Sequence, residues 1–266
     1  MKPLTGRWQE HWPEYLIEAW GLGLFMVNAC LIGIILEYPA SPVHQAIPNA
    51  LARRGLFGLA MGLTIAFLVY CPWGKRSGAH INPAITLTFL RLGKIAPMDA
   101  LFYVAAQFAG GLIGVVLLAL ALPRPMMYSK INYEATVPGP GGPLVALGAE
   151  AGISFLLMLT VLTVSNLPKL KAWLGVIMGV LVTFYVTFES PLSGMGMNPA
   201  RTFASALPAH LWTAAWVYFL IPPLAMLLAA ELYRRRKEAK ACAKLHHAGG
   251  GERCLFCEYE AHQADT

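Results

Sequence analysis

The segment Gly78-Ala-His-Ile-Asn-Pro-Ala-Ile-Thr-Leu-Thr-Phe-Leu90 decides the fold, together with a second segment that repeats its central triplet. That second segment is Gly194-Met-Gly-Met-Asn-Pro-Ala-Arg-Thr-Phe-Ala-Ser-Ala-Leu207. Asparagine is a favoured N-cap and proline suits the first helical position, so each Asn-Pro-Ala triplet predicts the start of a helix. We expect these helices to end near Leu92 and at Leu207. About ten residues then span roughly 15 Å, which is half of a bilayer core.

The rest of the chain has the composition of a membrane protein. Of its 266 residues 57% are hydrophobic and 13% are charged, with a mean hydropathy of +0.55. Soluble domains carry about 25% charged residues, so this chain could not cover itself with a polar surface. Blocks of roughly 20 apolar residues, the length that crosses a bilayer, recur six times. They are Trp12–Leu36, Gly55–Pro72, Ala96–Leu122, Leu144–Asn166, Trp173–Phe188 and Trp212–Leu232.

The placement of cations predicts the orientation of these spans. Lysine and arginine gather before the first block, after every second block and after the last, ending in the cluster Arg234–Lys237. By the positive-inside rule both termini face the cytoplasm of a cell that carries the protein in its plasma or inner membrane. The net charge of +6 follows from this bias, so it requires no nucleic-acid partner. The polar residues before the first block also argue against a cleaved signal peptide.

An internal repeat organises the membrane-spanning part of the chain. Residues 14–125 and 143–233 each contain three spans, with an Asn-Pro-Ala segment between the second and third. Three is an odd number, so the halves must be inverted, and inverted repeats with interrupted helices place their functional site at the midplane. The sequence predicts an all-α membrane protein of six transmembrane helices and two re-entrant half-helices. A cytoplasmic N-terminus (1–13) and a cytoplasmic tail (234–266) flank it.

These motifs resemble those of the aquaporin, or major intrinsic protein, family. The resemblance covers about residues 14–233 and rests on Ser77–Ala84, on Gly194–Arg201 and on three polar residues inside spans, Glu18, Gln107 and Glu150. It implies a right-handed bundle that assembles as a homotetramer in the lipid bilayer, each subunit conducting passively. A member of this family is expected to be neither an enzyme nor dependent on a cofactor.

The resemblance assigns the centre of the pore to the two triplets. Two half-helix N-termini that meet there present two positive dipole ends. The asparagine amides donate to the oxygen of a passing water, whose hydrogens then point outward, which interrupts proton transfer while the dipoles repel cations. This is the established explanation of aquaporin selectivity, carried over here by the resemblance. The residues concerned are Asn82, Pro83, Ala84, Asn198, Pro199 and Ala200.

A narrower constriction is expected on the outer side. Arginine at membrane depth is costly and is therefore a candidate functional residue, although snorkelling to the surface is the competing interpretation of Arg201. The resemblance places Arg201 at the constriction with Val186, Met195 and Met61, Gly62 being the alternative to Met61. Ordinary helix packing is the competing role for Met61 and Val186.

The substrate remains ambiguous at this level. Strict water channels of the family carry a histidine and an aromatic where Val186 and Met61 stand, whereas glycerol channels carry an aspartate where Thr202 stands. Tyr218-Phe219 in the last span also matches the water channels. We expect a water channel that also admits small neutral solutes such as glycerol or ammonia. The alternatives are a glycerol facilitator, a secondary transporter and a closed-pore structural protein.

Four polar residues are expected to support the re-entrant loops. Glu18 and Glu150 can accept backbone N–H groups that helical bonding leaves unsatisfied, and a proton relay is the competing interpretation. Gln107 belongs to the same set by resemblance. His80 is assigned to loop packing, with pH gating as its alternative.

The tail carries a separate pattern of metal-binding residue types. Cys254-Leu-Phe-Cys257, with Cys242 and His246, offers the four ligands that a tetrahedral zinc ion prefers. A disordered tail with reduced thiols and a redox role are the alternatives, and a cytosolic location disfavours a stable disulfide.

Overall fold

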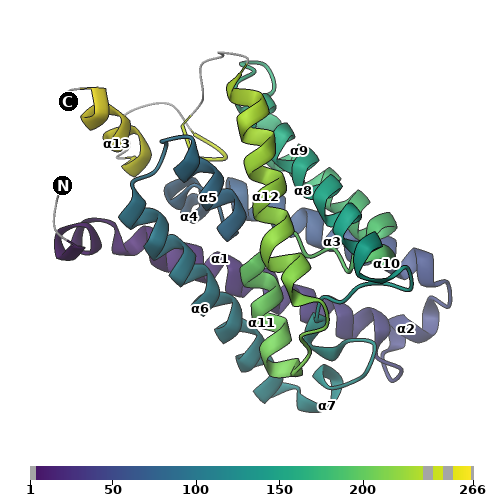
Figure 1. Cartoon of the computed structure of the whole chain (residues 1–266). Coiled ribbons are helices and arrows are strands. Elements are labelled where there is room, and N and C mark those ends of the chain that lie inside the picture. Colours follow the sequence, from purple (N-terminus) through teal and green to yellow (C-terminus); the bar gives the residue numbers. More distant parts are fainter. Residues whose placement is uncertain (1–3, 236–241, 248–253, 265–266) are drawn as a thin grey trace.

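The computed structural model describes residues 4–235, 242–247 and 254–264, and the regular structure of these residues is helical throughout. The long helices run side by side in one bundle (Figure 1). In chain order the elements are α1 Leu4–Glu37, α2 Pro42–Ala46, α3 Ala50–Tyr70, α4 Pro72–Ser77, α5 Pro83–Arg91, α6 Pro97–Ala121, α7 Pro123–Met126, η1 Asn132–Glu134, α8 Gly142–Ser165, η2 Lys171–Trp173, α9 Leu174–Phe184, η3 Tyr185–Glu189, α10 Ser190–Ser193, α11 Pro199–Ala209, α12 Ala215–Arg234 and α13 Leu255–Ala264.

Six segments of the described chain are long and apolar enough to cross a membrane, as the hydropathy pattern predicts. They are Trp8–Glu37, Ala50–Tyr70, Pro97–Ala121, Gly142–Ser165, Lys171–Ser193 and Ala215–Arg234. The first helix begins earlier than the pattern suggests, because α1 already starts at Leu4 and continues through Pro13. The predicted separate N-terminal segment 1–13 is thus largely an extension of the first transmembrane helix.

Two short helices fill the middle of the bundle. Both start at the predicted triplets, and α5 lies toward the end of the bundle that carries α13, whereas α11 lies toward the end that carries α7 (Figure 1). We call these the terminal end and the opposite end. The expected stop before Pro208 is wrong, since α11 continues to Ala209. Proline removes one N–H, and the N–H of His210 closes the last turn on the carbonyls of Ala206 and Leu207.

Glycines bring the second and fifth spans into backbone contact. A methyl group added at Gly62 would lie 2.3 Å from the carbonyl oxygen of Gly179, and one added at Gly179 would lie 2.6 Å from that of Gly62. Gly58 lies equally close to the carbonyl of Thr183. These close glycine contacts therefore mark the crossing of α3 and α9.

The fifth span departs from regular α-helix near the expected constriction. Tyr185–Glu189 form a π-helical turn between α9 and α10. Such a turn contains one extra residue and shifts the side chains that follow it. It places Val186 and Ser190 on the wall of the central cavity described below.

Candidate pore and selectivity site

The two asparagines of the triplets cap the half-helices and join them. The side-chain oxygen of Asn82 accepts from the N–H of Ala84, while its amide donates to the carbonyl of Met197 at 2.9 Å. The oxygen of Asn198 accepts from Ala200 N–H, and its amide donates to the carbonyl of Ile81 at 2.8 Å. An amide NH2 group has two hydrogens. Each asparagine thus keeps one donor for the cavity that both residues line.

Glu18 organises the first re-entrant loop from inside α1. Its carboxylate accepts from the Ser77 hydroxyl at 2.8 Å and from the backbone N–H groups of His80 and Ile81 at 3.1 and 2.6 Å. The amide of Gln107 donates to it at 2.8 Å. These bonds hold the loop although Ile81 has a left-handed φ of 42°. The geometry matches the predicted supporting role of both side chains.

Glu150, a residue of α8, organises the second re-entrant loop in the same way. It accepts from the Ser193 hydroxyl at 2.7 Å and from the N–H groups of Gly196 and Met197 at 2.5 and 2.7 Å. Met197 also has a left-handed φ, 54°. Non-helical backbone at membrane depth requires such internal partners, because lipid offers none. Each of the two buried carboxylates therefore accepts hydrogen bonds from backbone N–H groups of one loop.

A cavity of about 490 Å³ passes between the half-helices. At the opposite end it is lined by charged side chains, among them the ion pair of Arg53 with Glu37 at 2.9 Å. Its middle is lined by Asn82 and Asn198, and its terminal end by His80. The cavity thus links a charged vestibule with the two amide groups at the centre of the bundle.

The structure brings the four predicted constriction residues to this cavity. Arg201, Met61, Val186 and Met195 all line it, whereas Gly62 lies against Gly179 at the crossing of α3 and α9. The guanidinium of Arg201 donates to the hydroxyl of Thr136, which holds its side chain beside the cavity. The first half-helix carries an apolar residue, Ile85, at the position that corresponds to Arg201.

The sequence analysis did not assign the roles of several residues that support the cavity or its loops. Thr136 and Glu134 come from the loop between the third and fourth spans, which has no motif. Tyr103 and Tyr218 donate to the carbonyls of Ser77 and Ser193 at 2.7 and 2.6 Å, one in each repeat. The tyrosine pair was detectable in principle, since both residues occupy matching places in the third and sixth spans.

His80 packs within the first loop and also contacts the tail. Its ring stacks on Phe89 at 5.0 Å, and its Nδ1 lies 3.1 Å from the Thr86 hydroxyl. Nε2 lies 3.0 Å from the carbonyl oxygen of Ala243. A carbonyl only accepts, so Nε2 must carry the proton and donate. The ring therefore joins the half-helix to the tail.

In the tail, three cysteines meet a histidine, but not the one expected. The donor atoms of Cys242, His247, Cys254 and Cys257 all lie within 4.8 Å of one another. The choice of His246 is wrong, because its ring instead packs edge-on against Tyr70 with centroids 5.2 Å apart. The hydrogen bond from Cys242 lowers the pKa of the Cys254 thiol, which favours a thiolate there.

Comparison with known proteins identifies the class to which this architecture belongs. The profile of the Major intrinsic protein family matches residues 7–233. Aquaporin-8 of Notomys alexis is 32% identical over 245 residues, 87% of this chain and 86% of the relative. Aquaporin NIP2-3 of Zea mays is 34% identical over 189 residues, 70% of this chain but only 60% of the relative.

A solved structure has the same fold. The aquaglyceroporin from Plasmodium falciparum superimposes with a TM-score of 0.69 over 84% of this chain and 95% of its own, at 18% identity. The protein is thus a multi-pass membrane protein whose fold combines transmembrane helices with two half-helices. It belongs to the major intrinsic protein family, whose members are passive channels and not enzymes.

Proposed function

We propose that the chain is a passive water channel that also admits small neutral solutes and excludes protons and ions. One observation carries this proposal: the crossed hydrogen bonds of Asn82 and Asn198 leave one amide donor on each residue facing the same cavity. Two donors fixed at the N-termini of two opposed helices orient the oxygen of a water molecule toward both. Its hydrogens then point to the two ends of the pore.

Exclusion of ions follows from fixed charge at two levels of the pore. The positive ends of α5 and α11 meet at the centre, and Arg201 adds a guanidinium nearer the opposite end. A cation must leave its hydration shell to pass both. Neutral water replaces its lost hydrogen bonds by those of the amides and the guanidinium, so its barrier is lower.

The lining around Arg201 favours small neutral solutes as additional substrates. Met61, Val186 and Met195 offer an apolar wall opposite one strong donor. Such a wall contacts the carbon backbone of a polyol while the guanidinium binds its hydroxyl groups. Glycerol is therefore the second candidate substrate, and ammonia is small enough to follow water.

We extend the proposal to topology and assembly. Both termini would face the cytoplasm of a plasma or inner membrane, as the cation bias of the loops indicates. A homotetramer is typical of the family. Leu117, Leu120 and Leu144, more than 60% exposed in the single chain, would then contact lipid or neighbouring subunits.

Osmotic shrinkage of proteoliposomes tests the function directly. We expect water efflux at least about tenfold faster than from empty vesicles, with a low activation energy and without proton leak. Parallel swelling assays with glycerol, urea and ammonia rank the solutes. Dependence of transport on a sodium or proton gradient would instead show a transporter. Water flux no faster than in empty vesicles, measured with metal removed from the protein, would refute the channel.

A further inference from the structure

The tail of this chain carries a cluster that the channel function does not use. We propose that Cys242, His247, Cys254 and Cys257 bind a Zn²⁺ ion, and that the loaded site holds Leu245 in the terminal end of the pore and closes it. The site joins two described tail segments, 242–247 and 254–264.

The spacing of the donor atoms fits a tetrahedral ion. Zinc binds thiolate sulfur at about 2.3 Å and imidazole nitrogen at about 2.0–2.1 Å, so two sulfurs lie about 3.8 Å apart and a sulfur and a nitrogen about 3.6 Å. The sulfurs of Cys242 and Cys254 are 3.6 Å apart. The sulfur of Cys257 lies 3.5 Å from Nε2 of His247. These two distances match those around a tetrahedral zinc ion, and all four donor atoms lie within 4.8 Å of one another.

Local structure places the Cys-x-x-Cys pair for such a role. Cys254 directly precedes α13, and its carbonyl accepts from the N–H of Glu258 at 3.0 Å. Cys257 follows within the first turn of that helix, so both thiols point from one helix end toward Cys242. Three cysteines and a histidine form a common structural zinc set, whereas a disulfide needs sulfurs about 2.05 Å apart.

Each of the two tail segments contacts the rim of the pore. In the first segment the N–H of Leu245 donates to the carbonyl of Gly78 at 3.1 Å, and Ala243 accepts from His80 at 3.0 Å. In the second segment the ring of Phe256, fully buried, stacks on His80 with centroids 5.4 Å apart. The tail therefore rests on the first re-entrant loop, directly beside the half-helix that begins at Asn82.

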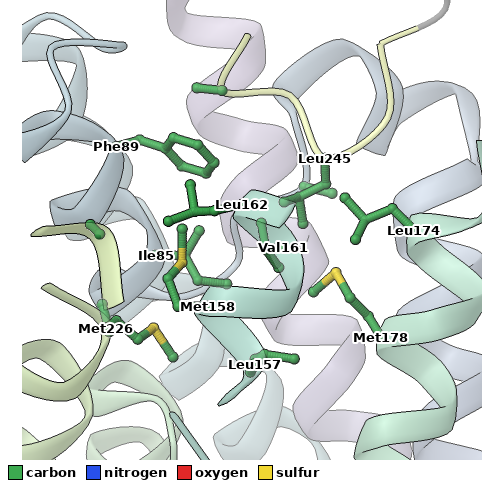
Figure 2. Close-up of a cluster of buried hydrophobic side chains, with 14 of the residues drawn as sticks. Ile85, Phe89, Leu157, Met158, Val161, Leu162, Leu174, Met178, Met226 and Leu245 are labelled. Carbon is green, nitrogen blue, oxygen red and sulfur yellow. The ribbon is translucent and has the colours of Figure 1, made fainter. Parts of the chain in front are cut away.

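Leu245 is the tail residue that enters the pore. It is 3% exposed and lines the same cavity as Asn82 and Arg201. Figure 2 shows its side chain beside Leu174 of α9, and both belong to one cluster of buried apolar side chains. An apolar side chain in a narrow wet path removes hydrogen-bond partners for water, and such constrictions stop flow by dewetting.

The metal is what makes this arrangement a switch. The tail is held on the pore by a few hydrogen bonds, the ring contacts of His246 and Phe256, and the ion pair of Lys94 with Glu260 at 2.5 Å. Buried apolar side chains, Ala243, Leu245 and Leu255, add to these contacts. A metal that ties both segments into one unit makes all these contacts form or break together, because it removes the freedom of each segment to leave separately. Chelation of the metal is therefore expected to release Leu245.

Metal binding is tested first, without any transport measurement. Full-length protein, purified and incubated with Zn²⁺, should retain one ion per chain after gel filtration. Substitution with Co²⁺ should give the intense thiolate-to-metal absorption of a tetrahedral site. Cys254→Ser and His247→Ala should abolish both signals. The matched controls Cys71→Ser and His246→Ala, which change a cysteine and a histidine outside the cluster, should retain them.

Two results would overturn the metal site. One is zinc content in the unsubstituted protein no higher than in Cys254→Ser. The other is an intact mass lower by two hydrogens, which would show a disulfide in place of the metal.

The second arm measures closure and rests on the proposed water function. In proteoliposomes, a chelator should raise water permeability of the unsubstituted protein at least about fivefold and leave Cys254→Ser unchanged at the higher value. Leu245→Ala should bind zinc normally and conduct in its presence. Equal flux with and without zinc in a protein that binds it would overturn the gate but not the site. Flux absent from every variant in both states would overturn the water function and the gate, while zinc content still decides the site.

Discussion

The two re-entrant loops, 77–82 and 193–198, share the same hydrogen-bond pattern but differ in the residues around it. In each, a serine and two backbone N–H groups donate to a buried glutamate, and a tyrosine donates to the carbonyl of that serine. The residues around this frame differ: His80 in the first loop corresponds to Gly196 in the second, and Ile85 corresponds to Arg201. In our proposal the shared part forms the centre of the pore. The divergent part places Arg201 beside the cavity at one end and His80 against the tail at the other.

The largest effect is expected where the loops are alike. Glu18→Ala leaves three donors without this acceptor, because the Gln107 amide still donates to Thr86. Glu150→Ala leaves two, because the Ser193 hydroxyl still donates to Glu189. At about 1–3 kcal/mol each, the losses are at least about 3 and about 2 kcal/mol. Thermal unfolding in detergent should show both, with Glu18→Ala the less stable. The control Glu231→Ala, which removes a partly exposed partner of Arg91 and Arg234, should lower stability by less than about 1 kcal/mol. Similar midpoints for all three variants would contradict the supporting role.

A smaller effect is expected where the half-helices differ. Arg201→Val removes the guanidinium from the cavity and should raise cation permeation about tenfold, which corresponds to about 1.4 kcal/mol, while water flux persists. Ile85→Val at the corresponding position of the first half-helix is the matched control and should leave selectivity unchanged. Both variants are measured in the swelling assay, and their permeability to cations is measured as conductance. Unchanged selectivity in Arg201→Val would place the filter elsewhere.

The smallest effect is expected at the contact between His80 and the tail. His80→Phe keeps an aromatic ring against Phe89 and Phe256 but removes the hydrogen bond to Ala243. Loss of about 1 kcal/mol should increase protease cleavage of the tail about fivefold. Glu260→Gln, which weakens only the partly exposed ion pair with Lys94, should change cleavage less. A cleavage rate equal to that of the unsubstituted protein would show that this bond does not hold the tail.

The fold was predictable because its signals are local. Asparagine followed by proline favours the start of a helix, and a run of about 20 apolar residues has the length to span a bilayer. The odd number of spans in each repeat then required the halves to be inverted. The end of α11 was misjudged because the N–H of His210 closes the last turn on the carbonyls of Ala206 and Leu207, although Pro208 has no N–H.

The ends of the pore were less predictable because they depend on distant segments. Thr136 contacts Arg201 across 65 positions of sequence, and nothing in its neighbourhood indicates this. The choice between His246 and His247 depended on which of two adjacent side chains faces the cysteines in an irregular segment. Composition predicted a metal site in the tail, but not that Leu245 would enter the pore.

The crossed asparagine bonds bear on how the protein is made. Asn82 donates to a carbonyl 115 residues later, and Ile81 accepts from an amide 117 residues later. At roughly 5–20 residues per second, a ribosome needs roughly 6–23 seconds to supply these partners. During that interval the first half of the nascent protein holds an unfinished re-entrant loop with unpaired polar groups. Its first loop can therefore reach its final depth only after synthesis of the second half, so the two halves mature together.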